Sequence, residues 1–193
     1  MSGATSPTGW TYAEYARLPD DGNRYEVLDG EVLTTPSPGT PHQRIAARLF
    51  IFLTEYVNRS GIGEMMWDLD LLFFTGQFLR PDMTYVPNDQ RHLLTDRGIE
   101  GMPGLVVEVL SPSSGRIDKV KKPARYADFG VPEYWVIDPS RKTILVWEFA
   151  VGGTEPRIVT DRLIWQPEAG VAPFELELSQ LFKDPLGHPR QGQ

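Results

Sequence analysis

Two short apolar runs decide the fold of this chain: R-P-D-M-T-Y-V at residues 80–86 and G-L-V-V-E-V-L-S-P at residues 104–112. Each run is typical of a β-strand, and each carries one carboxylate, Asp82 in the first and Glu108 in the second. Adjacent strands lie roughly 5 Å apart, so neighbouring carboxylates could converge on one ion. Because an isolated buried carboxylate is costly unless it is paired or binds a metal, the two runs predict a polar site within the sheet.

Each carboxylate also has an ordinary structural interpretation. Asp82 follows Pro81 and could cap a turn there. Glu108 interrupts a run that otherwise suits a strand covered on both sides, so the alternative to a functional role is a structural ion pair. The residues alone leave both interpretations open.

The length and composition are those of one ordinary globular domain. The chain has 193 residues, of which 40% are hydrophobic and 23% charged, which is enough for a single buried core. We expect one domain over residues 1–193, with an ordered core from about 10 to 183 and disorder at both ends. No apolar run approaches the roughly 20 residues of a membrane span, and the first residues lack the features of a signal peptide.

The charge and the cysteine count narrow the function classes. Because the sequence contains no cysteine, it excludes disulfides and thiolate metal sites and fits a reducing cytoplasm, where we expect the protein. The formal net charge of -7 argues against coating nucleic acid by bulk electrostatics, yet it leaves room for a local basic groove. An acidic chain also suits a site that gathers carboxylates around a cation.

A β-hairpin is predicted at residues 24–33, where Asp29-Gly30 separates two alternating runs. In that register Glu26 and Glu31 share one side of the ribbon with aliphatic residues. An exposed hairpin has no need for this mixture, so one of the two glutamates is a candidate site carboxylate. The alternative is a simple ion pair with a nearby arginine.

A helix is predicted over about residues 41–58, with His42 on its inward face near the N-terminus. His42 is a site candidate, although an inward histidine can also be a hydrogen-bonded core residue. The run W-D-L-D-L-L-F-F at residues 67–74 predicts a strand with Asp68 and Asp70 on one face. Asp70 is a weaker candidate for the site.

A second helix is predicted over residues 118–129. Asp118, Lys122 and Tyr126 recur every fourth residue and share one helix face, unless Pro123 disturbs the turn between them. Pro123 either opens the regular part of the helix or kinks it. Taken alone, the spacing of Asp118 and Lys122 indicates a surface ion pair.

Six sequence blocks, taken in order, resemble the Uma2 family of endonucleases with the PD-(D/E)xK restriction-endonuclease-like fold. The resemblance covers about residues 10–150 and extends more weakly to about 182. It implies an α/β fold of the mixed α+β kind, with a restriction-endonuclease-like core, a central mixed β-sheet flanked by helices, and the hairpin as an N-terminal extension. The blocks are Y-E-V-L-D-G-E (25–31), P-S-P…H-Q-R (36–44), R-P-D (80–82), V-V-E-V-L-S-P-S (106–113), D-x-x-x-K-x-x-x-Y (118–126) and G-V-P-E-Y-W-V-I-D-P (130–139).

The resemblance also implies roles for individual residues. Asp82 matches the first metal-binding aspartate, and Glu108 matches the acidic residue that follows it. The superfamily lysine would fall two residues later, where this sequence has Leu110, and the resemblance offers Lys122 on the next helix as its replacement. The implied metal is Mg²⁺, with Mn²⁺ able to substitute, and its ligands are Asp82 and Glu108. The predicted catalytic set is Asp82, Glu108, Lys122, His42 and Glu31.

The leading hypothesis for function is a metal-dependent endonuclease that hydrolyses DNA phosphodiester bonds. The alternative is a catalytically inactive relative that binds nucleic acid or a protein partner. Leu110 in place of the lysine and the acidic net charge favour this alternative, and a hydrolase of another phosphate substrate is a third reading. The expected partners are DNA and a divalent metal. A homodimer would supply the two sites that cutting both strands needs.

Overall fold

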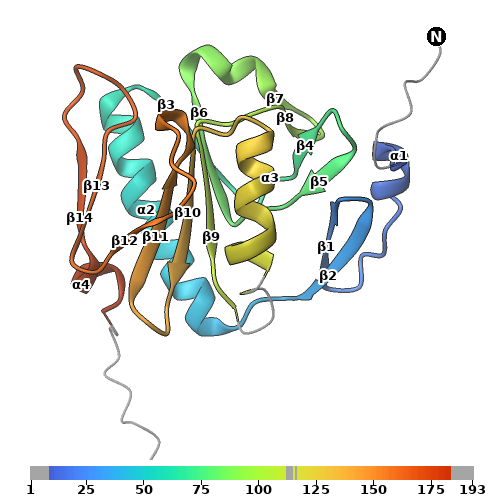
Figure 1. Cartoon of the computed structure of the whole chain (residues 1–193), viewed down its shortest axis with the longest axis horizontal. Coiled ribbons are helices and arrows are strands. Elements are labelled where there is room, and N and C mark those ends of the chain that lie inside the picture. The colour runs from blue at the N-terminus through green and yellow to red at the C-terminus, as the bar shows by residue number, and fades with distance from the viewer. Residues whose placement is uncertain (1–8, 112–114, 116, 184–193) are drawn as a thin grey trace, which may run out of the picture.

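The computed structural model describes residues 9–111, 115 and 117–183, and Figure 1 shows their arrangement. The disorder expected at the two ends of the chain falls on residues 1–8 and 184–193, outside the described residues. Most of the loop expected after the Glu108 strand, residues 112–114 and 116, also lies outside them. Within the described ranges, no helix is both long and apolar enough to span a membrane.

A six-stranded mixed sheet forms the centre of the molecule, in the order β12-β11-β10-β9-β6-β3. Its β9–β10 pair is parallel and its other pairs are antiparallel. The strands are β12 (Arg157–Val159), β11 (Thr143–Glu148), β10 (Glu133–Asp138), β9 (Leu105–Val109), β6 (Met83–Pro87) and β3 (Gly63–Trp67). This sheet confirms the mixed α+β prediction.

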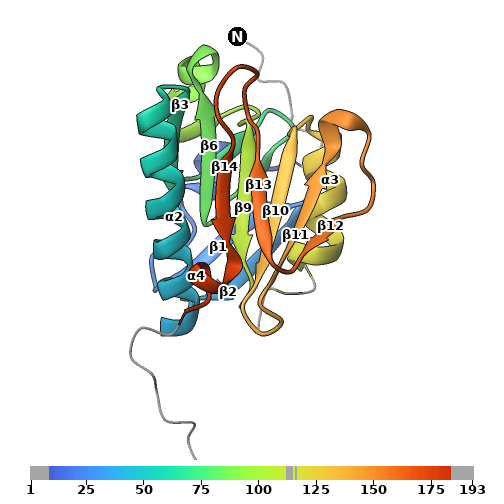
Figure 2. The same ribbon diagram turned by 90° about the vertical axis from the view of Figure 1, so that its left-hand side faces the viewer.

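Helices cover both faces of the central sheet, as Figure 2 shows. Helix α2 (Thr40–Ser60) packs on one face, where Leu49 and Leu53 join a core that includes Met83 and Val107. Helix α3 (Lys122–Asp128) packs on the other face. Because side chains alternate along a strand, successive residues of β9 face opposite cores.

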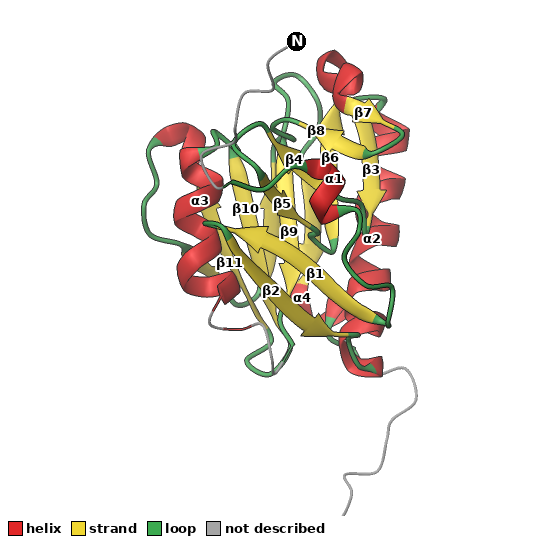
Figure 3. Ribbon diagram, turned by 90° about the vertical axis from the view of Figure 1, so that its right-hand side faces the viewer, coloured by secondary structure: helices red, strands yellow, loops and turns green. Residues whose placement is uncertain are grey.

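The N-terminal hairpin belongs to a second six-stranded sheet, in the order β2-β1-β5-β4-β8-β7, and Figure 3 shows it crossing in front of the central strands. The predicted register is confirmed, with Glu26 opposite Leu33 and Leu28 opposite Glu31. The hairpin is therefore the edge of a sheet, not a free extension. The strands are β1 (Asn23–Leu28), β2 (Glu31–Pro36), β5 (Gln77–Leu79), β4 (Leu71–Phe73), β8 (Gly98–Glu100) and β7 (Leu94–Thr95).

Smaller elements complete the described fold. Trp165 belongs to a third, two-stranded sheet and packs against Tyr56 of α2, with 5.9 Å between the ring centroids. This contact extends the core on the α2 side of the central sheet. The elements not yet named are α1 (Tyr12–Tyr15), a 3₁₀ turn (Asn88–Leu93), a second 3₁₀ turn (Phe149–Val151), β13 (Arg162–Trp165), β14 (Phe174–Glu177) and α4 (Leu178–Leu181).

The predicted strand over residues 67–74 is wrong in its first half. Strand β3 ends at Trp67, and Asp68 adopts a positive φ of 50°, which aspartate tolerates better than most residues. The backbone N–H of Asp68 donates to the carbonyl of Asp82 at 3.0 Å. Asp68 and Asp70 therefore lie in a connection between two sheets and do not share a strand face.

The predicted helix over residues 118–129 begins with an irregular turn. Residues Ile117–Lys121 form a π-helical turn, and the regular helix starts at Lys122. Pro123 stands at the start of that regular part, within its first two residues. Of the two predicted outcomes for Pro123, the structure has the opening of the helix.

Candidate active site

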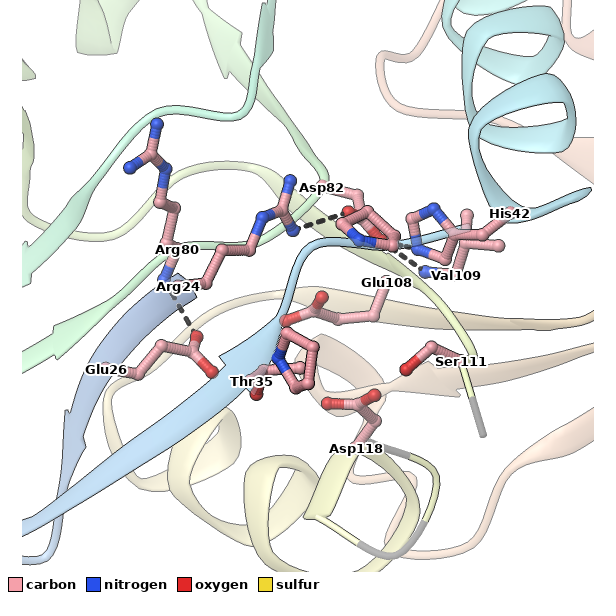
Figure 4. Close-up of a pocket in the computed structure, with 12 residues that line it drawn as sticks. Arg24, Glu26, Thr35, His42, Arg80, Asp82, Glu108, Val109, Ser111 and Asp118 are labelled. Carbon is pink, nitrogen blue, oxygen red and sulfur yellow. Dashed lines mark hydrogen bonds and ion pairs between the residues drawn. The ribbon is translucent and has the colours of Figure 1, made fainter. Parts of the chain in front are cut away.

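A small cavity of about 30 Å³ lies where the hairpin, α2, the π-helical turn before α3 and the central sheet meet. The register of β6 against β9 pairs Met83 with Val107, and Asp82 and Glu108 are the next residues along each strand. Both carboxylates line the cavity, as Figure 4 shows. The lining residues are Arg24, Glu26, Thr35, Pro36, Pro38, His42, Arg80, Asp82, Glu108, Val109, Ser111 and Asp118.

Both oxygens of the buried Asp82 carboxylate are held by the protein. Oδ2 accepts from the backbone N–H of Val109 at 2.8 Å and lies 3.0 Å from His42 Nε2. Oδ1 accepts from Arg24 Nη1 at 2.9 Å. Burial alone would raise the pKa of Asp82, but the contacts with His42, Val109 and Arg24 hold that pKa below its usual value. Asp82 is therefore a fixed, ionised carboxylate.

Lys122 is buried, with an exposed fraction of 2%, and its ammonium points at three carboxylates. Nζ lies 2.7 Å from Glu108 Oε1, 3.0 Å from Glu26 Oε1 and 3.3 Å from Asp118 Oδ1. Burial works against the charge, yet Glu108, Glu26 and Asp118 raise the pKa of Lys122 well above its usual value. The interpretation of Asp118 and Lys122 as a surface pair is wrong, because the π-helical turn brings both under the hairpin.

Burial leaves the Glu108 carboxylate poorly compensated. Burial is the main reason why its pKa is raised well above the usual value, and Asp118, Asp82 and Glu26 add to the rise. Lys122 opposes that rise and does not cancel it. Glu108 therefore favours the arrival of a proton or of another cation.

A chain of ion pairs leads from Asp82 to the surface. Arg24 Nη2 lies 2.6 Å from Asp68 Oδ1, and Arg80 Nε lies 3.1 Å from the same oxygen. Asp82 and Asp68, with Glu108 nearby, outweigh the burial of Arg24 and raise its pKa. The backbone N–H of Arg80 also donates to Glu26 Oε1 at 2.8 Å.

The charges of this group do not balance. Its five carboxyl groups outnumber its three basic side chains by two, so the group carries excess negative charge when all five are ionised. A low-dielectric interior magnifies such an excess. The carboxylates are Asp82, Asp68, Glu26, Glu108 and Asp118, and the basic side chains are Arg24, Arg80 and Lys122.

The structure does not bring Glu31 to the site, which corrects its place in the predicted catalytic set. The Glu31 side chain is 67% exposed and lies 3.3 Å from Lys121 Nζ. Glu26 takes the expected position instead, buried beside Lys122. The two glutamates share a face of the ribbon, but Glu31 lies two residues nearer the turn, roughly 7 Å further from the cavity.

Asp70 also lies apart from the cavity. Its Oδ1 accepts from the Tyr15 hydroxyl at 3.1 Å and lies 3.9 Å from Arg80 Nε.

Sequence reasoning did not single out Arg24 as a site residue, although a signal was present. Arg24 and Glu26 are two positions apart on strand β1, so their side chains point to the same face of the ribbon. A prediction that placed Glu26 at the site therefore also placed Arg24 near it.

Among the described residues, no group of three or more His, Asp or Glu side chains is arranged as a ready-made metal site. Asp82 and Glu108 are two of the four carboxylate side chains that line the cavity, together with Glu26 and Asp118. The side chains that the structure brings together are thus Asp82, Glu108, Lys122 and His42 of the predicted set, joined by Glu26, Asp118 and Arg24.

Comparisons with known proteins show a shared fold and a family for the chain. A crystal structure from Anabaena variabilis ATCC 29413, described as a putative nuclease belonging to DUF820, resembles the chain with a TM-score of 0.72 and 20% identity. The match covers 89% of this chain and 97% of that one, and at this identity it shows a shared fold. No curated protein matches the chain. The model of the Uma2 family, described as "Putative restriction endonuclease", matches residues 12–179, and the chain therefore belongs to that family.

Proposed function

We propose that this protein is a metal-dependent endonuclease that hydrolyses DNA phosphodiester bonds at the cavity lined by Asp82 and Glu108, with Lys122 beside Glu108. One observation carries the proposal: a buried ammonium lies 2.7 Å from a buried glutamate, at a cavity that also holds Asp82. Burying several charged side chains so close together lowers the stability of a fold, and such clusters occur most often at functional sites. The family's description as a restriction endonuclease supports a nuclease with DNA as its substrate.

The residues of the cavity fit a hard divalent cation. Carboxylate oxygens are the ligands that Mg²⁺ and Mn²⁺ prefer, and the excess negative charge beside Glu108 favours such an ion. Asp82 and Glu108 would hold the cation. When bound, the ion would supply a water of lowered pKa and neutralise charge on the phosphate oxygens.

Hydrolysis joins a water oxygen to phosphorus while one ester P–O bond breaks. The products are a phosphate on one strand end and a hydroxyl on the other, and the leaving oxygen takes a proton. Lys122 stays protonated because three carboxylates surround it, so its ammonium can stabilise negative charge that develops on the phosphate. Leu110 offers no charge from the strand, and Lys122 supplies it from the helix.

His42 holds Asp82 in place. Nε2 of His42 and the backbone N–H of Val109 approach the same oxygen, Oδ2, which fixes the plane of the carboxylate. Nδ1 of His42 is buried and makes no hydrogen bond with the described residues. Because His42 lies in the first turn of α2, it connects the Asp82 carboxylate to the longest helix of the described fold.

A second candidate function is binding without cleavage. It is favoured by the full occupation of the Asp82 carboxylate by Arg24, His42 and the Val109 N–H, which a purely structural network would also show. Cleavage and binding assays on the same variants separate the two candidates.

The test is the nicking of supercoiled plasmid with Mg²⁺ or Mn²⁺ and with chelator. We expect metal-dependent nicking by the wild type, at least about 100-fold less with Glu108→Gln, and wild-type nicking with Glu31→Gln as a matched control. Plasmid that stays intact with the wild type while a gel shift shows binding would support the binding function instead. Hydrolysis of a small phosphodiester without plasmid cleavage would indicate another phosphate substrate.

A further inference from the structure

Arg24 lies where a cation on Asp82 would be expected. Its Nη1 lies 2.9 Å from Asp82 Oδ1, and its Nη2 lies 2.6 Å from Asp68 Oδ1. The Glu108 carboxylate also contributes to the raised pKa of Arg24. Figure 4 shows the Arg24 side chain directed at Asp82 and the Arg80 side chain directed away from it. One guanidinium thus neutralises the carboxylate that the proposed cation needs.

The two oxygens of Asp82 differ in how easily they can change partners. Oδ2 is bound by a backbone N–H in β9 and by a histidine in α2, so releasing it requires movement of the central sheet or of the helix. Oδ1 is bound by one arginine side chain, which is 19% exposed at the cavity. A rotation of the Arg24 side chain is therefore the smallest change that frees a ligand oxygen of Asp82.

A phosphodiester is a natural competitor for Arg24. The guanidinium fork matches the oxygens of a phosphate as well as those of a carboxylate. Because Arg24 also contacts Asp68, it can leave Asp82 without losing every partner. The proposed function requires binding of a cation and binding of DNA, and both events would then open the ion pair between Arg24 and Asp82.

We propose that Arg24 is a positioning residue that competes with the divalent cation for Asp82 and gives up that carboxylate when a DNA phosphate binds the guanidinium. The inference rests on the proposed function. Cation binding and DNA binding then strengthen each other, because each removes a competitor of the other, and this coupling is reciprocal. The site consequently holds its metal weakly until nucleic acid is present.

Arg80 provides a matched control. Its Nε lies 3.1 Å from Asp68 Oδ1, so it carries the same charge on the same network. Its side chain is 40% exposed, and its Nε pairs with Asp68 and Asp70. Arg24→Gln and Arg80→Gln remove equal charge, but the first alone removes the contact with Asp82.

The first measurement is a titration of the full chain with Mn²⁺, without DNA, by calorimetry and by water-proton relaxation. We expect Arg24→Gln to bind Mn²⁺ at least about tenfold more tightly than the wild type, and Arg80→Gln to stay within about threefold of it. Equal affinity for Arg24→Gln and the wild type would overturn the inference. Equal gains in both variants would also overturn it, because they would reflect general charge alone, and so would an absence of Mn²⁺ binding in all three proteins.

The second measurement repeats the titration with a saturating short DNA duplex, using Ca²⁺ as an oxygen-seeking probe. DNA should tighten Ca²⁺ binding by about tenfold or more in the wild type and by less than about threefold in Arg24→Gln. Arg24→Lys keeps the charge but lacks the planar guanidinium fork, so it should be intermediate, and it preserves folding if Arg24→Gln does not fold. Identical tightening in wild type and Arg24→Gln would refute the coupling. Neither titration depends on cleavage, so a protein that cuts no DNA would fail the proposed function and leave the competition at Asp82 measurable.

Discussion

The ammonium of Lys122 lies 2.7 Å from Glu108 Oε1, and 14 positions of sequence separate the two residues. Glu108 comes from the middle of β9, while Lys122 is the first residue of regular helix after a π-helical turn. Because Glu26 and Asp118 approach the same ammonium, one cation compensates three buried carboxylates. The stability of the fold and the chemistry of the cavity therefore depend on the same atom.

Removal of this ammonium should destabilise the protein strongly. Lys122→Met leaves three buried carboxylates without their cation, and we expect the free energy of unfolding to fall by about 3–5 kcal/mol. Lys121→Met is the matched control, because Lys121 is half exposed and its pair with Glu31 contributes little. Urea unfolding of both variants measures the difference. Equal stability of the two variants would contradict the buried cluster.

The raised pKa of Glu108 predicts how stability depends on pH. An acid whose pKa is higher in the folded chain contributes stability that is complete below its unfolded value, here 4.5, and is lost as pH rises through the folded value. Between about pH 4 and pH 8, the wild type should therefore lose stability relative to Glu108→Gln. Urea unfolding across that range measures the difference, and Glu31→Gln should run parallel to the wild type. A Glu108→Gln curve parallel to the wild type would show that Glu108 titrates normally.

The two hairpin glutamates should differ in cleavage. Glu26 contacts Lys122 and the backbone N–H of Arg80, so Glu26→Gln should slow plasmid nicking by about tenfold or more by misplacing the ammonium. Glu31→Gln, exposed on the same ribbon face, should nick at the wild-type rate. Single-turnover rates at saturating metal separate this effect from metal binding. A slower Glu31→Gln would return Glu31 to the catalytic set.

Two buried tyrosines predict opposite effects of losing a hydroxyl. The Tyr126 hydroxyl makes no hydrogen bond with the described residues, whereas the Tyr134 hydroxyl donates to the Asp118 carbonyl at 3.0 Å. Tyr126→Phe should keep or raise the free energy of unfolding, and Tyr134→Phe should lower it by about 1 kcal/mol. Thermal unfolding measures both variants. A loss of stability in Tyr126→Phe would reveal a partner for that hydroxyl.

The features that could be predicted from the sequence depend on local patterns. Asp29-Gly30 and the alternation around it determine the hairpin register, and the two apolar runs place Glu108 on β9 and Asp82 directly before the neighbouring strand β6. The family resemblance also identified Lys122 as a candidate site residue. These inferences succeed because turn chemistry and side-chain period act within a few residues.

The features that could not be predicted depend on contacts between distant segments. A spacing of four residues is the same for a surface pair and for the buried pair of Asp118 and Lys122, and only the hairpin above them decides the difference. The choice between Glu26 and Glu31 likewise depends on which position of the ribbon lies over the buried Lys122. Asp68 leaves the strand through its positive φ of 50°, a backbone turn that the local pattern of residues 67–74 does not encode.

The position of the cation, on helix or strand, is the last testable point. Leu110 follows β9 on the same side as Glu108 and is only partly buried. Its backbone N–H donates to the Ile137 carbonyl at 2.9 Å, which fixes the backbone at this position. A lysine there would send its ammonium toward Glu108 from the strand. In a Lys122→Ala background, which should neither cleave DNA nor fold stably, Leu110→Lys should restore part of both properties.

The control for this experiment is Leu110→Met in the same Lys122→Ala background, because methionine fills similar volume without charge. We expect the lysine double variant to exceed the methionine double variant by at least about 1 kcal/mol in unfolding free energy and by about tenfold or more in nicking rate. The two readouts carry different meanings. Recovery of folding without cleavage would mean that the ammonium only compensates the carboxylates, whereas recovery of neither would mean that its approach from α3 is essential. Recovery of both would establish that the site requires a cation beside Glu108 and does not require the helix that delivers it.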